Sequence, residues 1–185
     1  KAEIAALQNS IATVINIKDV ELVKLQDITS KIGSGATPSS GEAAYIEKGI
    51  TLIRSQNVYD GEFYTKGLAF IDDEQATKLN NVTIEENDIL FNITGASVCR
   101  CCMVDSSLLP ARVNQHVSII RVNEKAIPKY VQTILVSAEY KSRLLDIAKG
   151  ATSREAITKL QLEEFKIPLP PIPTQKKIVG EINKI

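Results

Sequence analysis

Hydrophobic residues near the start of the chain recur at alternating spacings of three and four, with alanine and polar residues between them. This spacing is typical of a coiled-coil seam. It lasts only about two heptads, which is too short for a stable isolated helix, so it requires a partner helix. We therefore predict a helical arm over residues 1–19 whose seam binds a partner through Ile4, Leu7, Ile11 and Val14.

A second helical pattern lies at the other end of the chain. Pro171 and Pro173 stiffen the approach, and Thr174 can cap a helix in which hydrophobic residues step by four and three. We predict that residues 171–185 begin a spacer helix and that its seam also binds a partner. The pattern has no stop signal and the first residue is not Met, so we expect a piece of a longer protein. The seam consists of Ile178, Ile182 and Ile185.

Between the two helical segments the pattern changes to short runs rich in Val, Ile and Phe, which indicate β-strands. Turn residues separate them, including the loop over residues 33–41 and a hairpin turn at Asp60-Gly61. The spacing predicts a curled, mostly antiparallel sheet within one domain over residues 20–170. The predicted strands cover residues 20–25, 50–54, 68–71, 89–93, 98–104, 117–122 and 165–169.

Helical periodicity returns at three places inside this domain. One long amphipathic helix is predicted after Pro128, with Gly150 as the residue that ends it. The acidic run over residues 72–74 indicates the first turn of a short helix, and Thr158 with Gln161 forms a possible capping box for another. The predicted fold class is thus α/β (α+β), with coiled-coil-type helical segments flanking the domain.

Composition limits the cellular context. The 185 residues are 44% hydrophobic, enough for one sizeable core, yet no window approaches the roughly 18 apolar residues of a membrane span. The N-terminal residues show no basic segment followed by an apolar signal core, so we expect a soluble, cytoplasmic protein that does not contact membranes. The three cysteines are crowded and odd in number, which favours a reducing compartment and free thiols: Cys99, Cys101 and Cys102.

We expect no metal and no cofactor. The cysteines lack the two-residue gap typical of zinc sites, and strand alternation would send Cys101 and Cys102 to opposite faces. Small buried hydrophobic residues are the better interpretation of the thiols. His116 is the only histidine, and it lies beside an amide rather than a nucleophile, which gives no reason to invoke a catalytic triad.

Charge balances overall but not along the chain. Residues 1–95 contain 8 Lys or Arg and 14 Asp or Glu, whereas residues 96–185 contain 14 and 8. Such polarity can steer a polyanion to one face, although ordinary proteins also show it.

Short motifs follow one another in a characteristic order along the chain. They are the strand and Gly-Thr-Pro-like loop over 23–39, the segments 49–58, 87–96 and 114–117, and the tail from 150 to 179. This ordered set, over residues 20–185, resembles the target recognition domain of type I restriction-modification specificity subunits, and the resemblance rests on the order rather than on any single motif. Asn87 stands where the family commonly has Gly, and asparagine tolerates the left-handed conformation. Cys99 stands where a second Gly is frequent, so the resemblance does not define the backbone around Arg100.

The resemblance implies a DNA-binding module without catalysis. Such a domain would read one half of a bipartite duplex target, while its helices dock methyltransferase subunits and, indirectly, the restriction subunit. Self-association through the helical arms is a further expectation. The chain has no Asn-Pro-Pro-aromatic motif and no Gly-rich cofactor loop, so adenine methylation and cleavage would belong to partner subunits.

Candidate DNA-contacting residues lie in loops, and each has a structural alternative. Small hydroxyl residues beside glycine let phosphates approach, and the alternative is that the same loop is an ordinary turn. Amides and arginine can pair with base edges, or they can close loops by bonding to the main chain. The candidates are Ser34, Thr37, Arg54, Ser55, Gln56, Asn57, Asn92, Thr94, Ser97, Arg100, Asn114, Gln115 and Arg154.

Two other function classes stay open from the sequence. The domain could come from a fused restriction-methyltransferase enzyme, in which case a methyltransferase motif would precede it. It could also be a helix-mediated assembly protein that never contacts DNA. Recognition of the target bases depends on loop geometry and DNA deformability as well as on side-chain type.

Overall fold

A computed structural model describes residues 20–38, 41–150 and 155–182. Its strands form three sheets. The central sheet has the order β2 (Thr29–Ser34), β8 (Val117–Val122), β5 (Ile89–Asn92) and β6 (Cys101–Met103), and every pair in it is antiparallel. A second sheet has the order β4 (Ala69–Ile71), β3 (Ile50–Ile53) and β7 (Ala111–Val113), in which β3 and β7 are parallel. A third pairs β1 (Leu22–Lys24) with β9 (Lys166–Pro168).

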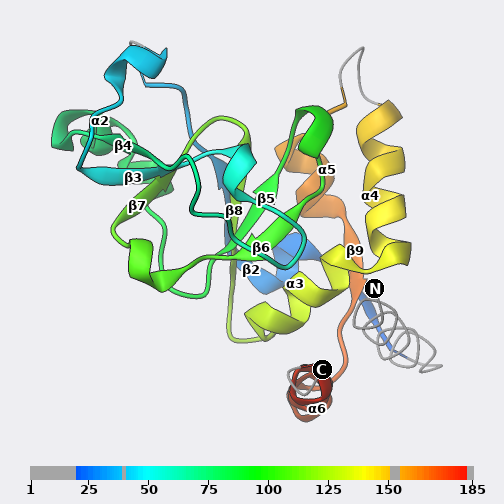
Figure 1. Ribbon diagram of the computed structural model, residues 1–185. Coiled ribbons are helices and arrows are strands. Elements are labelled where there is room, and N and C mark those ends of the chain that lie inside the picture. Colours follow the sequence, from blue (N-terminus) through cyan, green and yellow to red (C-terminus); the bar gives the residue numbers. More distant parts are fainter. Residues whose placement is uncertain (1–19, 39–40, 151–154, 183–185) are drawn as a thin grey trace.

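The helices gather mainly on one side of the central sheet. Figure 1 shows the β4-β3-β7 sheet on the left, the central sheet in the middle and most helices on the right. The α-helices are α2 (Asp73–Lys78), α3 (Pro128–Val136), α4 (Ala138–Gly150), α5 (Lys159–Glu164) and α6 (Ile172–Ile182). None of the helices within the described ranges is long and apolar enough to cross a membrane.

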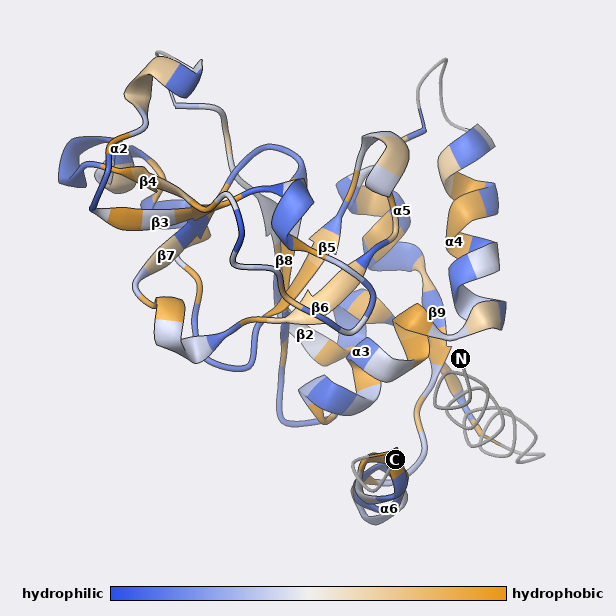
Figure 2. Ribbon diagram, in the orientation of Figure 1, coloured by the Kyte–Doolittle hydropathy of each residue, from blue (hydrophilic) through white to orange (hydrophobic). Residues whose placement is uncertain are grey.

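Both faces of the central sheet are buried. Ile89, Phe91 and Ile120 belong to a core shared with α3 and α4, whereas Leu90 and Ile119 belong to a second core shared with the β4-β3-β7 sheet. Because side chains alternate between faces, a strand buried on both faces needs apolar residues at every position. This requirement explains the continuous hydrophobic runs, which Figure 2 shows along the central strands.

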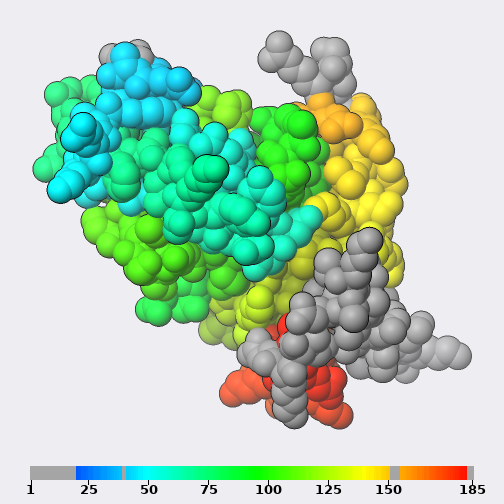
Figure 3. All heavy atoms as spheres, viewed as in Figure 1, coloured from blue at the N-terminus to red at the C-terminus, as the bar shows by residue number. Residues whose placement is uncertain are grey.

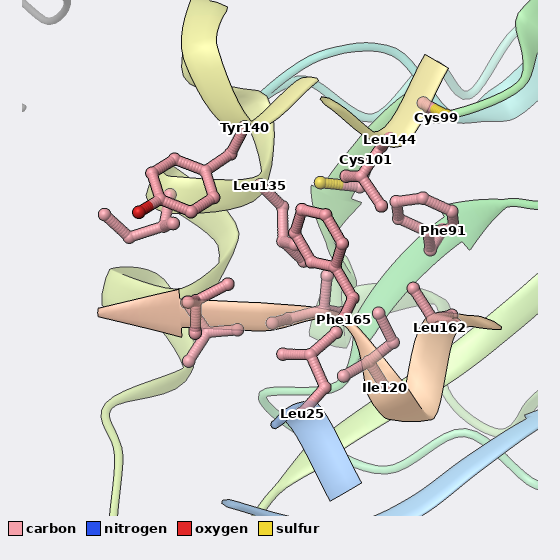
Figure 4. Packing of buried hydrophobic residues seen from close by; sticks show 14 of the residues in the cluster. Leu25, Phe91, Cys99, Cys101, Ile120, Leu135, Tyr140, Leu144, Leu162 and Phe165 are labelled. Carbon is pink, nitrogen blue, oxygen red and sulfur yellow. The ribbon is translucent and has the colours of Figure 1, made fainter. Parts of the chain in front are cut away.

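The larger core contains the aromatic side chains of Phe91, Tyr130, Tyr140 and Phe165. Figure 4 shows Phe165 among Leu25, Leu135 and Ile120. The ring of Phe165 meets Tyr140 edge to face, with centroids 6.2 Å apart. This contact holds α4 against the segment that leads into β9.

The predicted elements are largely confirmed, with differences in the number of sheets, in two strands and in the long helix. The strands are mostly antiparallel, as expected, but they form three sheets rather than one. Strands β2 and β7 were not predicted, because Gly33 interrupts the first pattern and Pro110 and Arg112 flank or interrupt the second. The single long helix was wrong: it breaks at Ser137, whose backbone is extended and whose hydroxyl donates to the Ile134 carbonyl at 2.7 Å. A serine hydroxyl can compete in this way with helical hydrogen bonding.

Several local predictions are confirmed by the structure. Thr158 and Gln161 form the predicted capping box of α5. Asp73 and Glu74 lie in the first turn of α2 as predicted, whereas Asp72 is its N-cap rather than part of that turn. Cys101 faces the first core and Cys102 the second, and both thiols are buried and free. Asn87 and Cys99 have φ values of 68° and 66°, so both adopt the left-handed conformation that glycine favours.

Helix α6 differs from its prediction in its start and in its packing. It begins at Ile172, and Thr174 lies inside its first turn rather than capping it. Ile178 is only 3% exposed and belongs to the core shared with α3, with Ile182 packed against that core. The predicted partner-binding role of Ile178 therefore needs correction, because a side chain buried within its own domain is not free for a partner. Ile4, Leu7, Ile11, Val14 and Ile185 lie outside the described residues.

Candidate nucleic-acid interface

Four loops meet at one edge of the two larger sheets. The end of β2 and the end of β5 both pair with the start of β8, through Ser34–Ser118 and Asn92–Val117. The parallel strands β3 and β7 end side by side at the same edge, and the Asn114 amide donates to the Ile53 carbonyl at 3.0 Å. The ends of β2 and β5 and the loops that follow β2, β3, β5 and β7 carry all the predicted DNA-contacting residues in the described ranges. We call this edge the loop edge.

Asn92 joins two of these loops. Its side-chain nitrogen donates to the carbonyl oxygen of Ser55 at 2.9 Å and to the hydroxyl of Ser97 at 3.1 Å. A longer bond of 3.4 Å reaches the Val58 carbonyl. The side chain is fully buried, and its oxygen has no hydrogen-bond partner among the described residues. Asn92 thus positions the surface loops and is not itself exposed to a ligand.

Neighbouring residues after β3 have different roles. Asn57 is fully buried: its oxygen accepts from the Arg54 amide at 3.1 Å, and its nitrogen donates to the carbonyls of Tyr64 and Lys66. It closes the loop and has no face left for a base. Gln56 is exposed, and its nitrogen donates to the Gly67 carbonyl at 3.1 Å. The guanidinium of Arg54 also donates to Gly67, at 2.7 Å, and lies 3.6 Å from the Glu42 carboxylate, so much of its capacity is used within the domain.

A hairpin after this loop supplies an aromatic platform. The Gly61 amide donates to the Cys101 carbonyl at 2.9 Å, and Lys141 forms an ion pair with Asp60, so the hairpin tip is fastened to β6 and α4. Tyr59 lies against Tyr64, with ring centroids 4.3 Å apart. The Arg100 guanidinium lies over the Tyr59 ring at 4.6 Å from its centroid. The platform holds an arginine at the loop edge.

Polar contacts also connect the loop after β5 with the loop after β7. His116 Nδ1 lies 2.8 Å from the Thr94 hydroxyl, and its Nε2 lies 3.0 Å from the side-chain nitrogen of Gln115. Asn114 is buried, and its oxygen accepts from the His116 amide at 3.0 Å. The Gln115 oxygen is buried without a partner among the described residues. Thr94 and His116 therefore lie side by side at the loop edge, while Asn114 stabilises the turn between β7 and β8.

The glycine-containing loop after β2 packs on the β7–β8 connection. The Gly35 amide donates to the Asn114 carbonyl at 3.1 Å, and a Cβ at Gly35 would come within 1.8 Å of the Val113 carbonyl oxygen. Only glycine allows this close approach. Thr37 is exposed beyond it, and Ser34 lines a separate hollow with Lys31, Asn81 and Lys159.

The loop edge contains a hollow of about 380 Å³. Figure 3 shows the cyan segment after β3 beside the green segment after β5 on one face of the molecule. The structure brings five predicted residues to the hollow and adds Tyr59 and His116. Sequence reasoning missed Tyr59, although a tyrosine two residues before a predicted hairpin Gly was a usable signal. Arg154 lies outside the described residues. The hollow is lined by Ser55, Gln56, Tyr59, Thr94, Gly95, Ala96, Ser97, Arg100 and His116.

The chemistry of the hollow suits recognition rather than covalent or metal chemistry. Its lining offers hydroxyls, an amide and a guanidinium, and no carboxylate from the described residues lines it. The nearby thiols are protonated at neutral pH, because burial raises the pKa of Cys99 and of Cys102 to about 12. Within the described ranges no three His, Cys, Asp or Glu side chains converge to hold a metal ion.

Known proteins resemble this chain along most of its length. The curated type I restriction enzyme MjaX specificity subunit of Methanocaldococcus jannaschii is 24% identical over 180 residues, covering 90% of this chain and 42% of that protein. The HsdS subunit from Thermoanaerobacter tengcongensis matches with a TM-score of 0.69 and 18% identity, over 99% of this chain and 43% of that one. A chain from a structure of type I R-M complex assembly and conformational transition matches with a TM-score of 0.71 and 19% identity. The match covers 99% of this chain and 44% of that one.

These solved structures share the fold, and the chain spans less than half the length of each relative. The family model for the type I restriction modification DNA specificity domain matches residues 17–184. Because that model covers nearly the whole chain, the chain belongs to the type I restriction modification DNA specificity domain family.

Proposed function

We propose that this domain binds duplex DNA sequence-specifically through the loop edge and reads one half of a bipartite target. The observation that carries the proposal is the convergence of three loops, those after β3, β5 and β7, on one hollow lined by hydroxyl, amide and guanidinium groups. Base edges in the major groove are distinguished by such donors and acceptors. Buried Asn57, Asn92 and Asn114 hold the loops in place, which reduces the entropy lost on binding.

We further propose that the domain carries no catalysis and acts in the cytoplasm with methyltransferase subunits, which in turn recruit the restriction subunit. The family membership supports this division of labour, as does the name of the curated relative, a specificity subunit. Eight residues remain proposed DNA contacts: Ser34, Thr37, Ser55, Gln56, Thr94, Ser97, Arg100 and Gln115. Arg54 also remains a proposed contact, although its guanidinium already contacts Gly67 and Glu42 within the domain. Arg154 and the N-terminal seam remain proposals that the described residues do not address.

The experiment is methylation mapping in cells that express the intact protein with its methyltransferase partner. A bipartite adenine-methylated motif that depends on this protein is the expected result. Absence of any new methylated motif, together with equal affinity of the purified complex for all duplexes, would overturn the proposal. A titration over salt concentration complements the mapping, because phosphate contacts by lysine and arginine lose affinity as salt rises.

A further inference from the structure

The guanidinium of Arg100 lies at the loop edge without a negatively charged partner among the described residues. Among the described residues, no ion pair and no hydrogen bond engages its guanidinium, and no carboxylate lines its hollow. Its recorded contact is with the face of Tyr59, 4.6 Å from the ring centroid. A guanidinium stacked on an aromatic ring keeps the donors on its edge free for a planar partner.

The stack is rigidly supported. Tyr59 packs against Tyr64, and the Tyr64 amide donates to the Asn57 carbonyl at 2.8 Å. The Gly61 amide fastens the same hairpin to β6. Little conformational freedom is therefore lost when the guanidinium binds a ligand, which favours a precise contact over a loose electrostatic one.

Gln56 supplies a hydrogen-bond acceptor to the hollow in which Arg100 supplies donors. Its side-chain nitrogen donates to the Gly67 carbonyl, so the acceptor oxygen is the part of the amide that stays available. Gly67 has a φ of 70°, and a Cβ there would come within 2.9 Å of the Gln56 nitrogen. A glycine at this position is thus needed to hold the amide where it lies.

We propose, on the basis of the proposed function, that Arg100 and Gln56 together read one G·C base pair. Arg100 donates to O6 and N7 of the guanine, and the Gln56 oxygen accepts from N4 of the paired cytosine. A phosphate group offers only acceptor oxygens, so it would leave the Gln56 oxygen without a donor. An A·T pair offers arginine no comparable pair of acceptors on one base.

The test begins with the half-site obtained from methylation mapping and uses the intact protein in complex with its methyltransferase partner. Duplexes carry 7-deazaguanine, which lacks N7, at each guanine in turn, and an A·T pair at each G·C position. For wild type, the A·T replacement at one position is expected to weaken binding about 5- to 150-fold, with a smaller loss for 7-deazaguanine at that position. In Arg100→Ala the 7-deazaguanine loss disappears and the A·T loss shrinks to the part that Gln56 contributes, and Gln56→Ala removes that part at the same pair.

Arg143→Ala is the matched control. This exposed arginine also lies over aromatic rings, those of Tyr140 and Phe165, but it lines a different hollow between α4 and the α5–β9 segment. Its removal takes away the same charge and should leave the ranking of all duplexes unchanged. Arg100→Lys, which keeps the charge but not the planar fork or its stacking on Tyr59, should keep only part of the discrimination.

Three results would overturn the inference and leave the proposed function intact: a mapped half-site with no G·C pair, a wild-type complex indifferent to every 7-deazaguanine, or an Arg100→Ala variant that weakens all duplexes equally. The last result would assign Arg100 to a phosphate. The first two are read from wild-type protein, so they decide the matter even if a variant does not fold. A wild-type complex that prefers no duplex at all would instead refute the proposed function itself.

Discussion

The side-chain nitrogen of Asn92 lies 2.9 Å from the carbonyl oxygen of Ser55, although the two residues are 37 positions apart in the chain. Asn92 ends a strand of the central sheet and Ser55 follows a strand of the neighbouring sheet. The same nitrogen also donates to the hydroxyl of Ser97, which lies in the loop after β5. One buried amide therefore sets the relative position of two loops that line the hollow.

Replacing Asn92 with Ala should destabilise the domain and weaken DNA binding together. Loss of a buried amide that serves several backbone and hydroxyl groups costs about 1–3 kcal/mol. Urea denaturation and binding to the mapped half-site measure the two effects. Asn81→Ala, at an exposed position, is the control and should change neither. Unchanged stability of the Asn92 variant would show that the amide is not the connection between the loops.

Gln56→Ala should change the DNA sequence preference, whereas Asn57→Ala should lower the stability of the domain, although the two residues are adjacent. Gln56 is exposed at the hollow, so its loss should change sequence preference and leave the free energy of unfolding within about 0.5 kcal/mol. Asn57 is fully buried with three backbone partners, so its loss should cost about 1–3 kcal/mol. A panel of single-mismatch duplexes and a denaturation curve separate the two. Equal loss of stability in both variants would contradict this assignment.

Cys99→Gly should be far less harmful than Cys101→Gly. Both side chains are completely buried, but Cys99 has a φ of 66°, a conformation that costs an L-residue about 1–2 kcal/mol and that glycine adopts freely. Relief of this strain offsets the lost burial, so the change in unfolding free energy should stay within about 1 kcal/mol. Cys101 lies in an extended strand and has no strain to relieve. Chemical denaturation of both variants checks this, and equal losses would argue against a strained backbone at Cys99.

The buried thiols should make stability fall at alkaline pH. Burial raises the pKa of Cys99 and Cys102 to about 12 in the folded state, above their ordinary value of 9.0. The unfolded chain therefore releases these protons first, so stability is fully present below about pH 9 and decreases as the pH rises from there towards 12. Iodoacetamide at pH 8 should modify the thiols slowly in the folded protein and rapidly in urea. Fast modification without denaturant would mean that the thiols are accessible.

The ion pair between Asp88 and Arg121 should contribute strongly to stability. Asp88 is fully buried, and both its oxygens accept from the Arg121 guanidinium at 2.8 Å. Asp88→Ala removes the buried carboxylate and leaves Arg121 with the exposed Glu85 carboxylate and the Thr83 carbonyl, so it should cost about 1–3 kcal/mol. Glu85 also pairs with Arg121 but is 61% exposed, so Glu85→Gln should cost less than about 1 kcal/mol. Denaturation curves of the two variants provide the comparison, and similar losses would show that burial does not distinguish the pairs.

The sequence by itself determined the elements whose signals are local. Hydrophobic alternation located most strands, the Thr158–Gln161 spacing located a helix start, and Asn87 marked a left-handed position. The candidate residues of the loop edge were also visible, because amides, hydroxyls and arginine cluster in predicted loops.

Tertiary structure alone decided which of those residues face a ligand. Gln56 and Asn57 have the same chemistry and adjacent positions, yet one is exposed and the other closes a loop. The division of strands among three sheets, the burial of Ile178 and the stacking of Arg100 on Tyr59 were likewise absent from the local pattern. The physical reason is that exposure and partner choice depend on groups distant in sequence, such as Asn92 and Ser55, which meet only after the sheets have packed.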